Sequence, residues 1–218
     1  DAQGWSHSVE LDDYTMMSQA YFVNDSLGLS LCFRDFVDST IDFFGRVVII
    51  ENRTDRERQV RLYFGQVFQI SRGGRGDTAL YVPASHPYVL TYNSNISFAA
   101  SLRTQDGEAF DEFAVGNYGI EGKDGTYKDA EDGQLSGNLV EHGGVDSVIQ
   151  TSFALKPKGA FHVDYWVAAS EKNYNDASHI HRTLAKNGLF HYLNATNMHW
   201  KTWISRSNDF LQQIDQKY

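Results

Sequence analysis

The sequence contains few of the residues that cross-link or stiffen a chain. Of its 218 residues, one is cysteine and three are proline. Cys32 has no intrachain partner for a disulfide, and its place in a strand-like run favours a buried structural thiol. Packing of apolar side chains, which make up 41% of the residues, must therefore hold the fold together.

Positive charge is also scarce. The chain has 19 Lys and Arg against 28 Asp and Glu, a formal net charge of −9, and its basic residues form no stripe. This balance argues against nucleic acid or an anionic membrane as a partner. No apolar run approaches the roughly 18 residues needed to span a bilayer. The chain begins at Asp1, which indicates a removed upstream segment and leaves two compartments open, cytoplasmic or secreted in a prokaryote.

Common catalytic and ligand-binding motifs are missing as well. There is no G-x-S-x-G elbow, and the glycine-rich run Arg72–Gly76 lacks both the Walker lysine pattern and a following helix. His179 and His181 fall on different faces of a predicted helix, which is wrong for one metal. His191 and His199 have no carboxylate or Cys at matching spacing, so we interpret all four as surface or packing histidines.

Alternation of apolar and polar residues is what the chain does have, and it predicts half-buried strands. We predict strands over about 29–38, 43–50, 60–70, 79–82, 87–92, 96–103, 149–155 and 161–167. The segments 41–51 and 59–70 flank the charged turn Asn52–Asp55 and are expected to pair as an antiparallel hairpin, bent near Gly65. Many strands joined by Gly, Asn and Asp turns predict a mainly β fold, an antiparallel sandwich.

The pattern changes from strands to helices after Ser170. Residues 173–187 read as a helix that stops at Gly188, and a second helix is predicted over 189–210. We therefore expect a sandwich domain over 1–170 and a helical segment over 171–218. The apolar stripes of these helices need a partner, which is either the sheet or a helical domain outside the chain.

A candidate site lies in the long segment 104–147, where we expect irregular structure rich in Gly, Asp and Glu. Clustered carboxylates there could supply one partner of a sugar-cleaving pair, although their spacing does not show the other. A solvated turn and a calcium site are the alternatives, and the spacing of an EF-hand is not met. The candidate residues for carbohydrate contact are Tyr127, Asp129, Glu131, Asp132 and Asn138.

Several longer runs resemble one enzyme family. The most specific is Gly125–Asn138 together with Gly144–Ser147, and Leu31–Asp38, Arg46–Arg56 and Val60–Ile70 add to it. The chain resembles the N-terminal β-sandwich domain of prokaryotic glucoamylase-like glycoside hydrolases (family 15 type), which include glucoamylase and glucodextranase. The likeness covers most of the chain and continues to the predicted helices.

The resemblance implies an antiparallel supersandwich, of the galactose mutarotase-like kind, joined by linker helices to an (α/α)6 catalytic barrel outside the chain. Two glutamates of that barrel would release glucose from α-glucans with inversion, so no residue here inherits a catalytic role and no cofactor is implied. The family pattern also implies that the chain opens within an early strand. An unpaired sheet edge and the surface facing the barrel would then favour self-association.

Three functions follow as hypotheses. The first is an accessory domain that stabilises the barrel and lends the 104–147 loop to the rim of its active site. The second is a stand-alone carbohydrate-binding module, with exposed Trp or Tyr stacking on glucan. The third is an enzyme in its own right, because related sandwiches occur in sugar mutarotases and before the barrels of glycoside phosphorylases.

Overall fold

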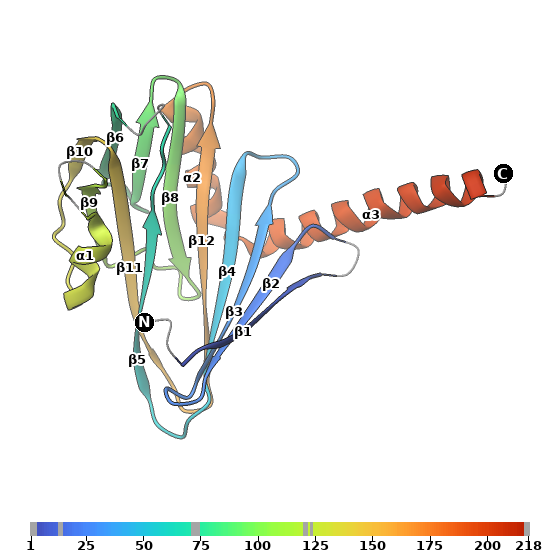
Figure 1. Ribbon diagram of the computed structural model, residues 1–218, viewed down its shortest axis with the longest axis horizontal. Coiled ribbons are helices and arrows are strands. Elements are labelled where there is room, and N and C mark those ends of the chain that lie inside the picture. The colour runs from blue at the N-terminus through green and yellow to red at the C-terminus, as the bar shows by residue number, and fades with distance from the viewer. Residues whose placement is uncertain (1–3, 13–14, 71–74, 120–121, 123, 216–218) are drawn as a thin grey trace.

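The computed structural model describes residues 4–12, 15–70, 75–119, 122 and 124–215, and only the backbone of 207–215. Within them, two antiparallel sheets face each other and two long helices follow (Figure 1). This arrangement confirms the predicted mainly β sandwich. The glycine-rich run Arg72–Gly76 lies mostly outside the described residues.

The larger sheet has nine strands in the described part of the chain, and the smaller sheet has three. The large sheet runs, in spatial order, β1 (Ser6–Leu11), β2 (Ser18–Asn24), β3 (Leu29–Val37), β4 (Phe43–Asn52), β12 (Ala160–Ser170), β8 (Ile96–Thr104), β7 (Tyr88–Asn93), β6 (Asp77–Val82) and β10 (Val140–Gly143). The small sheet runs β5 (Arg58–Gln66), β11 (Val145–Leu155) and β9 (Glu112–Asn117).

The predicted hairpin between 41–51 and 59–70 is wrong. Strand β4 pairs with β3 and β12, whereas β5 ends at Gln66 and pairs with β11 in the other sheet. The burial patterns explain the difference. In β4, Val47 and Val48 point to opposite faces and both are buried, while β5 is buried on one side only. A strand covered on both faces belongs at the centre of the large sheet.

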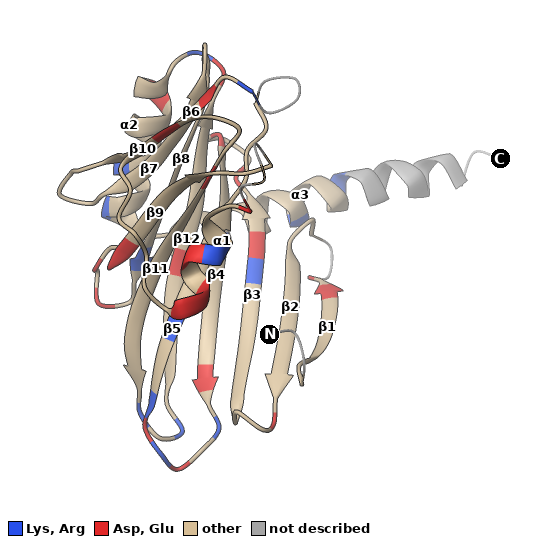
Figure 2. Ribbon diagram, turned by 60° about the vertical axis from the view of Figure 1, so that its left-hand side comes forward, with Lys and Arg blue, Asp and Glu red and all other residues tan. Residues whose placement is uncertain are grey.

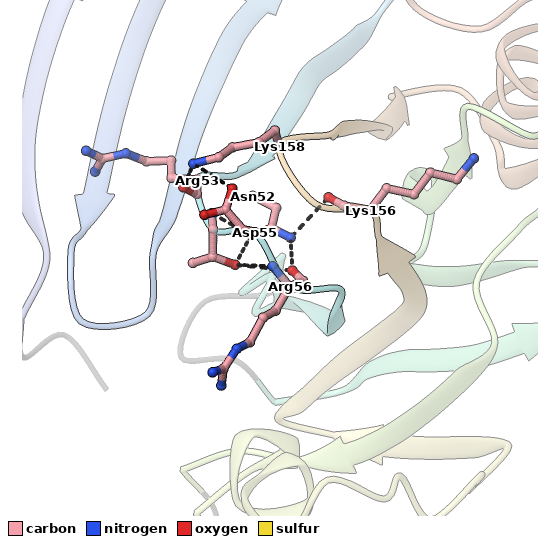
Figure 3. A network of polar contacts seen from close by, with 7 residues as sticks. Asn52, Arg53, Asp55, Arg56, Lys156 and Lys158 are labelled. Carbon is pink, nitrogen blue, oxygen red and sulfur yellow. Dashed lines mark hydrogen bonds and ion pairs between the residues drawn. The ribbon is translucent and has the colours of Figure 1, made fainter.

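A buried asparagine holds the place where the chain crosses between the sheets (Figure 3). Asn52 is 2% exposed, and its Nδ2 lies 2.6 Å from the Arg56 carbonyl, 3.2 Å from that of Leu155 and 3.0 Å from that of Lys156. Its Oδ1 accepts from the Thr54 amide at 3.0 Å. One side chain thus joins the β4–β5 connection to the β11–β12 connection and satisfies the buried carbonyl of Leu155 and two partly buried carbonyls beside it.

The exposed rim of the same crossing carries weaker contacts. Lys158 donates to the Arg53 carbonyl at 2.8 Å and lies 3.4 Å from the Asp55 carboxylate. A hydrogen bond from the Gly159 amide to the Lys156 carbonyl closes the turn between β11 and β12. Because both side chains of the ion pair are largely exposed, it adds little stability.

The central strands of the large sheet are buried on both faces, so the chain has two cores. Between the two sheets lie Val48, Ile50, Leu102, Ile149 and Val163. On the opposite face, Phe43, Val47, Trp166, Leu184 and Leu193 pack between the sheet and the helices. The alternation of β4 and β12 places successive side chains in one core and then the other.

The helices α2 (Tyr174–Asn187) and α3 (Phe190–Asp215) begin and end close to the predicted positions. Asn173 caps α2, since its Oδ1 accepts from the amides of Asn175 and Asp176. Gly188, at a φ of 69°, ends it as predicted. Helix α2 packs on the outer face of the large sheet, whereas α3 leaves the sandwich after its first turns (Figure 1).

The direction of α3 is set where it begins. The carboxylate of Asp164, a buried residue of β12, accepts a hydrogen bond from the Leu189 amide at 2.8 Å. Tyr192 and Leu193 then pack against the sheet, and Thr196 donates to Asp38 in the β3–β4 loop. No helix among the described residues is long and apolar enough to cross a membrane.

The segment 104–147 is more regular than expected. It contains β9, the short helix α1 (Thr126–Asp129), a 3₁₀ turn (Ala130–Asp132) and β10, and β11 begins at Val145. These elements were missed because strands of four to six residues are too short to show a clear alternation. Strand β1 forms one edge of the large sheet in the described part of the chain, and its Val9 and Leu11 are 65% and 66% exposed.

His181 is a packing histidine, as expected, and fully buried. It accepts from Trp166 Nε1 through Nδ1 at 3.3 Å, and its Nε2 donates to the His86 carbonyl at 3.0 Å. These two bonds define the neutral tautomer with hydrogen on Nε2. Burial lowers the pKa of His181 to about 4, and it also lowers the pKa of His86.

We predict that Asn52→Ala lowers the free energy of unfolding by about 1–3 kcal/mol, because the carbonyls of Arg56, Leu155 and Lys156 lose a donor and that of Leu155 is buried. Urea unfolding of both proteins measures the difference. The exposed Asn194 on α3 provides the control, and Asn194→Ala should stay within about 0.5 kcal/mol of the parent. An equal effect of the two substitutions would contradict the role assigned to Asn52.

We predict that acid weakens the fold through His181. The pKa of His181 is about 4 in the folded chain and 6.5 in the unfolded chain, so between these values the unfolded chain binds a proton that the folded chain does not. The folded state is therefore most stable, with respect to this group, above pH 6.5, and it loses stability as the pH falls toward 4. The loss between pH 6.5 and 5 should be about 2 kcal/mol. Urea unfolding across this range should therefore show a steeper slope for the parent than for His181→Leu. Parallel slopes would contradict the prediction.

Candidate functional site

A segment built on α1 crosses the outer face of the small sheet, on the side away from the core (Figure 2). Its first helical residue is anchored on β11, because the amide and hydroxyl of Thr126 both donate to Asp146 Oδ2, at 2.6 and 2.9 Å. Its far end is anchored on β5, where Arg61 Nη1 donates to the Gly133 carbonyl at 2.6 Å. The segment thus bridges two strands of the small sheet.

Glycines allow this close approach. Gly116 pairs with Asp146 across β9 and β11, and a Cβ there would lie 2.7 Å from Thr126 Cγ2. Gly125 precedes the helix at a φ of 100°, a conformation that other residues rarely adopt. Both positions therefore select glycine for a physical reason.

A pocket of about 170 Å³ lies between the α1 segment and the small sheet. Its lining includes Tyr63, Gln66, Tyr118, Tyr127, Asp146 and Val148. Tyr118 and Tyr127 are 41% and 54% exposed, so their rings are also open to solvent. The pocket therefore combines aromatic surface with a small number of polar groups.

Two of the residues that line the pocket each carry a buried polar atom with no hydrogen-bond partner. These atoms are Asp146 Oδ1 and the hydroxyl of Tyr63. Asp146 is 5% exposed, and burial raises the pKa of its carboxyl against the opposing effect of the Thr126 hydrogen bonds. Leaving a buried polar atom unpaired costs about 1–3 kcal/mol, so each of these two atoms calls for an explanation.

The predicted carboxylates do not gather in this pocket. Asp129 accepts from the Ser136 amide at 2.7 Å, and Asp132 accepts from the Gln134 amide at 2.9 Å. Glu131 lies 3.3 Å from Lys128 Nζ at the surface. Each carboxylate contacts its own turn, so these interactions describe how the segment keeps its shape.

The two remaining predicted residues lie apart from those turns. Tyr127 lines the pocket, whereas Asn138 donates to the Val115 carbonyl at 2.7 Å and to Glu141 Oε1 at 3.0 Å. Among the described residues, no group of three or more His, Cys, Asp or Glu could hold a metal ion. The described side chains therefore supply no cluster of donors for calcium, and the calcium site stays a prediction.

Sequence reasoning missed Tyr63 and Asp146. Asp146 lies in the run Gly144–Ser147, which carried the family resemblance without suggesting a role. The available signal was an acidic residue inside a buried apolar strand, between Val145 and Val148. Acidic residues are almost never fully buried without a reason.

Comparison with known proteins identifies the fold. No protein-family model matches the chain, and no curated protein matches it. A bacterial glucoamylase complexed with acarbose matches with a TM-score of 0.71 and 11% identity, over 92% of this chain and 29% of the other. A putative kojibiose phosphorylase from the human microbiome matches with a TM-score of 0.56 and 10% identity, over 88% of this chain and 25% of the other.

The chain has the β-sandwich fold found in glucoamylase-type enzymes. This confirms the resemblance that the sequence suggested, and at identities near one in ten it establishes the fold alone. The chain spans about a quarter of the length of both similar proteins, so most of each lies outside the shared region.

Proposed function

We propose that this chain is the non-catalytic N-terminal domain of a glucoamylase-type glycoside hydrolase. The observation that carries the proposal is the fold match over 92% of this chain and 29% of the bacterial glucoamylase. Its partner is an (α/α)6 catalytic barrel that releases glucose from α-glucans. The kojibiose phosphorylase match supports a related alternative, the equivalent domain of a glycoside phosphorylase.

Helix α3 supports the proposal as the linker to the barrel. It extends from the sandwich and carries three largely exposed apolar side chains: Phe190, Met198 and Trp203 are 66%, 64% and 56% exposed. Exposed apolar surface on one extended helix is costly in water and is typical of an interaction site. A barrel that follows α3 would cover it.

An apolar cleft beside the same end of the sheet supports the position of the partner. It has a volume of about 420 Å³, and Phe44, Phe68, Phe98 and Val167 are among its lining residues. Asp42 of the β3–β4 loop also lines it, and Thr196 of α3 is bonded to Asp38 in that loop. The linker and the cleft therefore share a loop, and one partner can contact both.

The α1 segment would contribute to the rim of the barrel's active site. Tyr127, Asp129, Glu131, Asp132 and Asn138 are the residues proposed to contact α-glucan there. In the isolated chain, the exposed surfaces of α3, the cleft and β1 would instead favour self-association. Sedimentation of the isolated chain as a monomer at all concentrations would contradict that part of the proposal.

Comparison of the whole parent enzyme with a version lacking residues 1–170 tests the proposal. Without the sandwich we expect a lower midpoint of thermal unfolding and a raised KM for long maltooligosaccharides relative to maltose. Trp203→Ala in the whole enzyme should lower the midpoint alone, because it alters docking and leaves the α1 segment intact.

The unfolding midpoint and the KM test different parts of the proposal. An unchanged unfolding midpoint would contradict the accessory role. An unchanged dependence of KM on glucan length would contradict the rim role of the α1 segment.

A further inference from the structure

The pocket beneath the α1 segment has the features of a binding site that the proposed rim role does not require. It is a fixed cavity, because Thr126 and Gly133 anchor the segment to β11 and β5 on either side of it. Two of its lining residues, Asp146 and Tyr63, also carry the unpartnered buried atoms, Oδ1 and the phenolic hydroxyl. Buried polar groups are normally paired, so their natural partner is a molecule that enters the pocket.

The size of the pocket limits what that molecule can be. At about 170 Å³ it falls below the roughly 300 Å³ at which pockets for drug-sized ligands begin. It therefore has room for one six-membered ring with its hydroxyl groups and not for an extended chain. Any further unit of a longer ligand must lie outside, over the exposed rings of Tyr118 and Tyr127.

The chemistry of the lining favours a neutral, hydroxyl-rich ring. A tyrosine hydroxyl can donate and accept, and a carboxyl group can accept from a ligand hydroxyl or, when protonated, donate to one. Burial raises the pKa of the Asp146 carboxyl, and the hydrogen bonds from Thr126 oppose that shift. Among the residues that the structure describes, no Lys or Arg lines the pocket, which argues against a phosphate or carboxylate ligand. The tyrosine rings offer the aromatic surface on which the apolar face of a sugar packs.

We infer that this pocket binds the terminal hexose of an α-glucan, with hydrogen bonds to Tyr63 and Asp146 and with Tyr127 packed against the next ring. The inference rests on the proposed function for the choice of sugar. It adds a carbohydrate site within the sandwich itself, formed entirely by this chain.

Titration of the full 218-residue chain with D-glucose and maltose, followed by amide chemical shifts in NMR, tests the inference. Saturable shifts are expected for the amides of Thr126 and Val148, with millimolar dissociation constants and with maltose binding at least as tightly as glucose.

Tyr63→Phe is the decisive variant. It removes a hydroxyl that has no partner in the structure, so it should leave the free energy of unfolding unchanged or raise it. If the hydroxyl bonds the sugar, the same substitution should weaken glucose binding about tenfold. Tyr127→Ala should weaken maltose binding more than glucose binding. Tyr174→Phe, an exposed tyrosine on α2, is the matched control and should change neither.

Two results would overturn the inference. One is the absence of saturable shifts at tens of millimolar of either sugar. The other is equal binding by the parent chain and Tyr63→Phe, which would show that ordered water fills the pocket. Neither result bears on the accessory role, which is judged by the stability of the parent enzyme.

Discussion

The arrangement of the molecule depends on how the chain passes between its two sheets. At one end of the sandwich, β4 continues into β5 and β11 continues into β12, and each pair changes sheet within a few residues. Where the two crossings approach each other, carbonyls of both connections are partly or fully buried and need a donor. The side-chain amide of Asn52 bonds to both connections and so fixes their separation. The alignment of the small sheet over the large one follows from this contact.

The two cores and the position of the helices follow from the same crossing. Because β4 and β12 are neighbours at the centre of the large sheet, each carries apolar side chains on both faces. The small sheet packs on one face of the large sheet, and α2 packs on the other. Trp166 and His181 join sheet and helix through a buried hydrogen bond, and Asp164 accepts one from the amide of Leu189, directly before α3. The sandwich therefore determines where α3 begins and in which direction it leaves.

Local sequence patterns predicted where helices and strands lie better than they predicted which strands pair. Asn173 and Gly188 are residue types that typically begin and end a helix, so they predicted the limits of α2. The alternation from Val163 to Val167 likewise predicted a strand without showing which strands it pairs with. The pairing of β4 was mispredicted because a short charged turn favours a hairpin, whereas burial on both faces is a tertiary property. At the site, Tyr127 was found through its carboxylate-rich surroundings. Asp146 and Tyr63 were missed because the lack of a hydrogen-bond partner cannot be seen in a sequence.

The central claim is that this sandwich serves a catalytic barrel, and the reading frame beyond Tyr218 tests it most directly. The account predicts that the frame continues into the helices of an (α/α)6 barrel that carries two well-separated glutamates. A stop codon directly after Tyr218 would contradict it. Sugar binding by the pocket beneath α1 would then become the leading account of what the chain does.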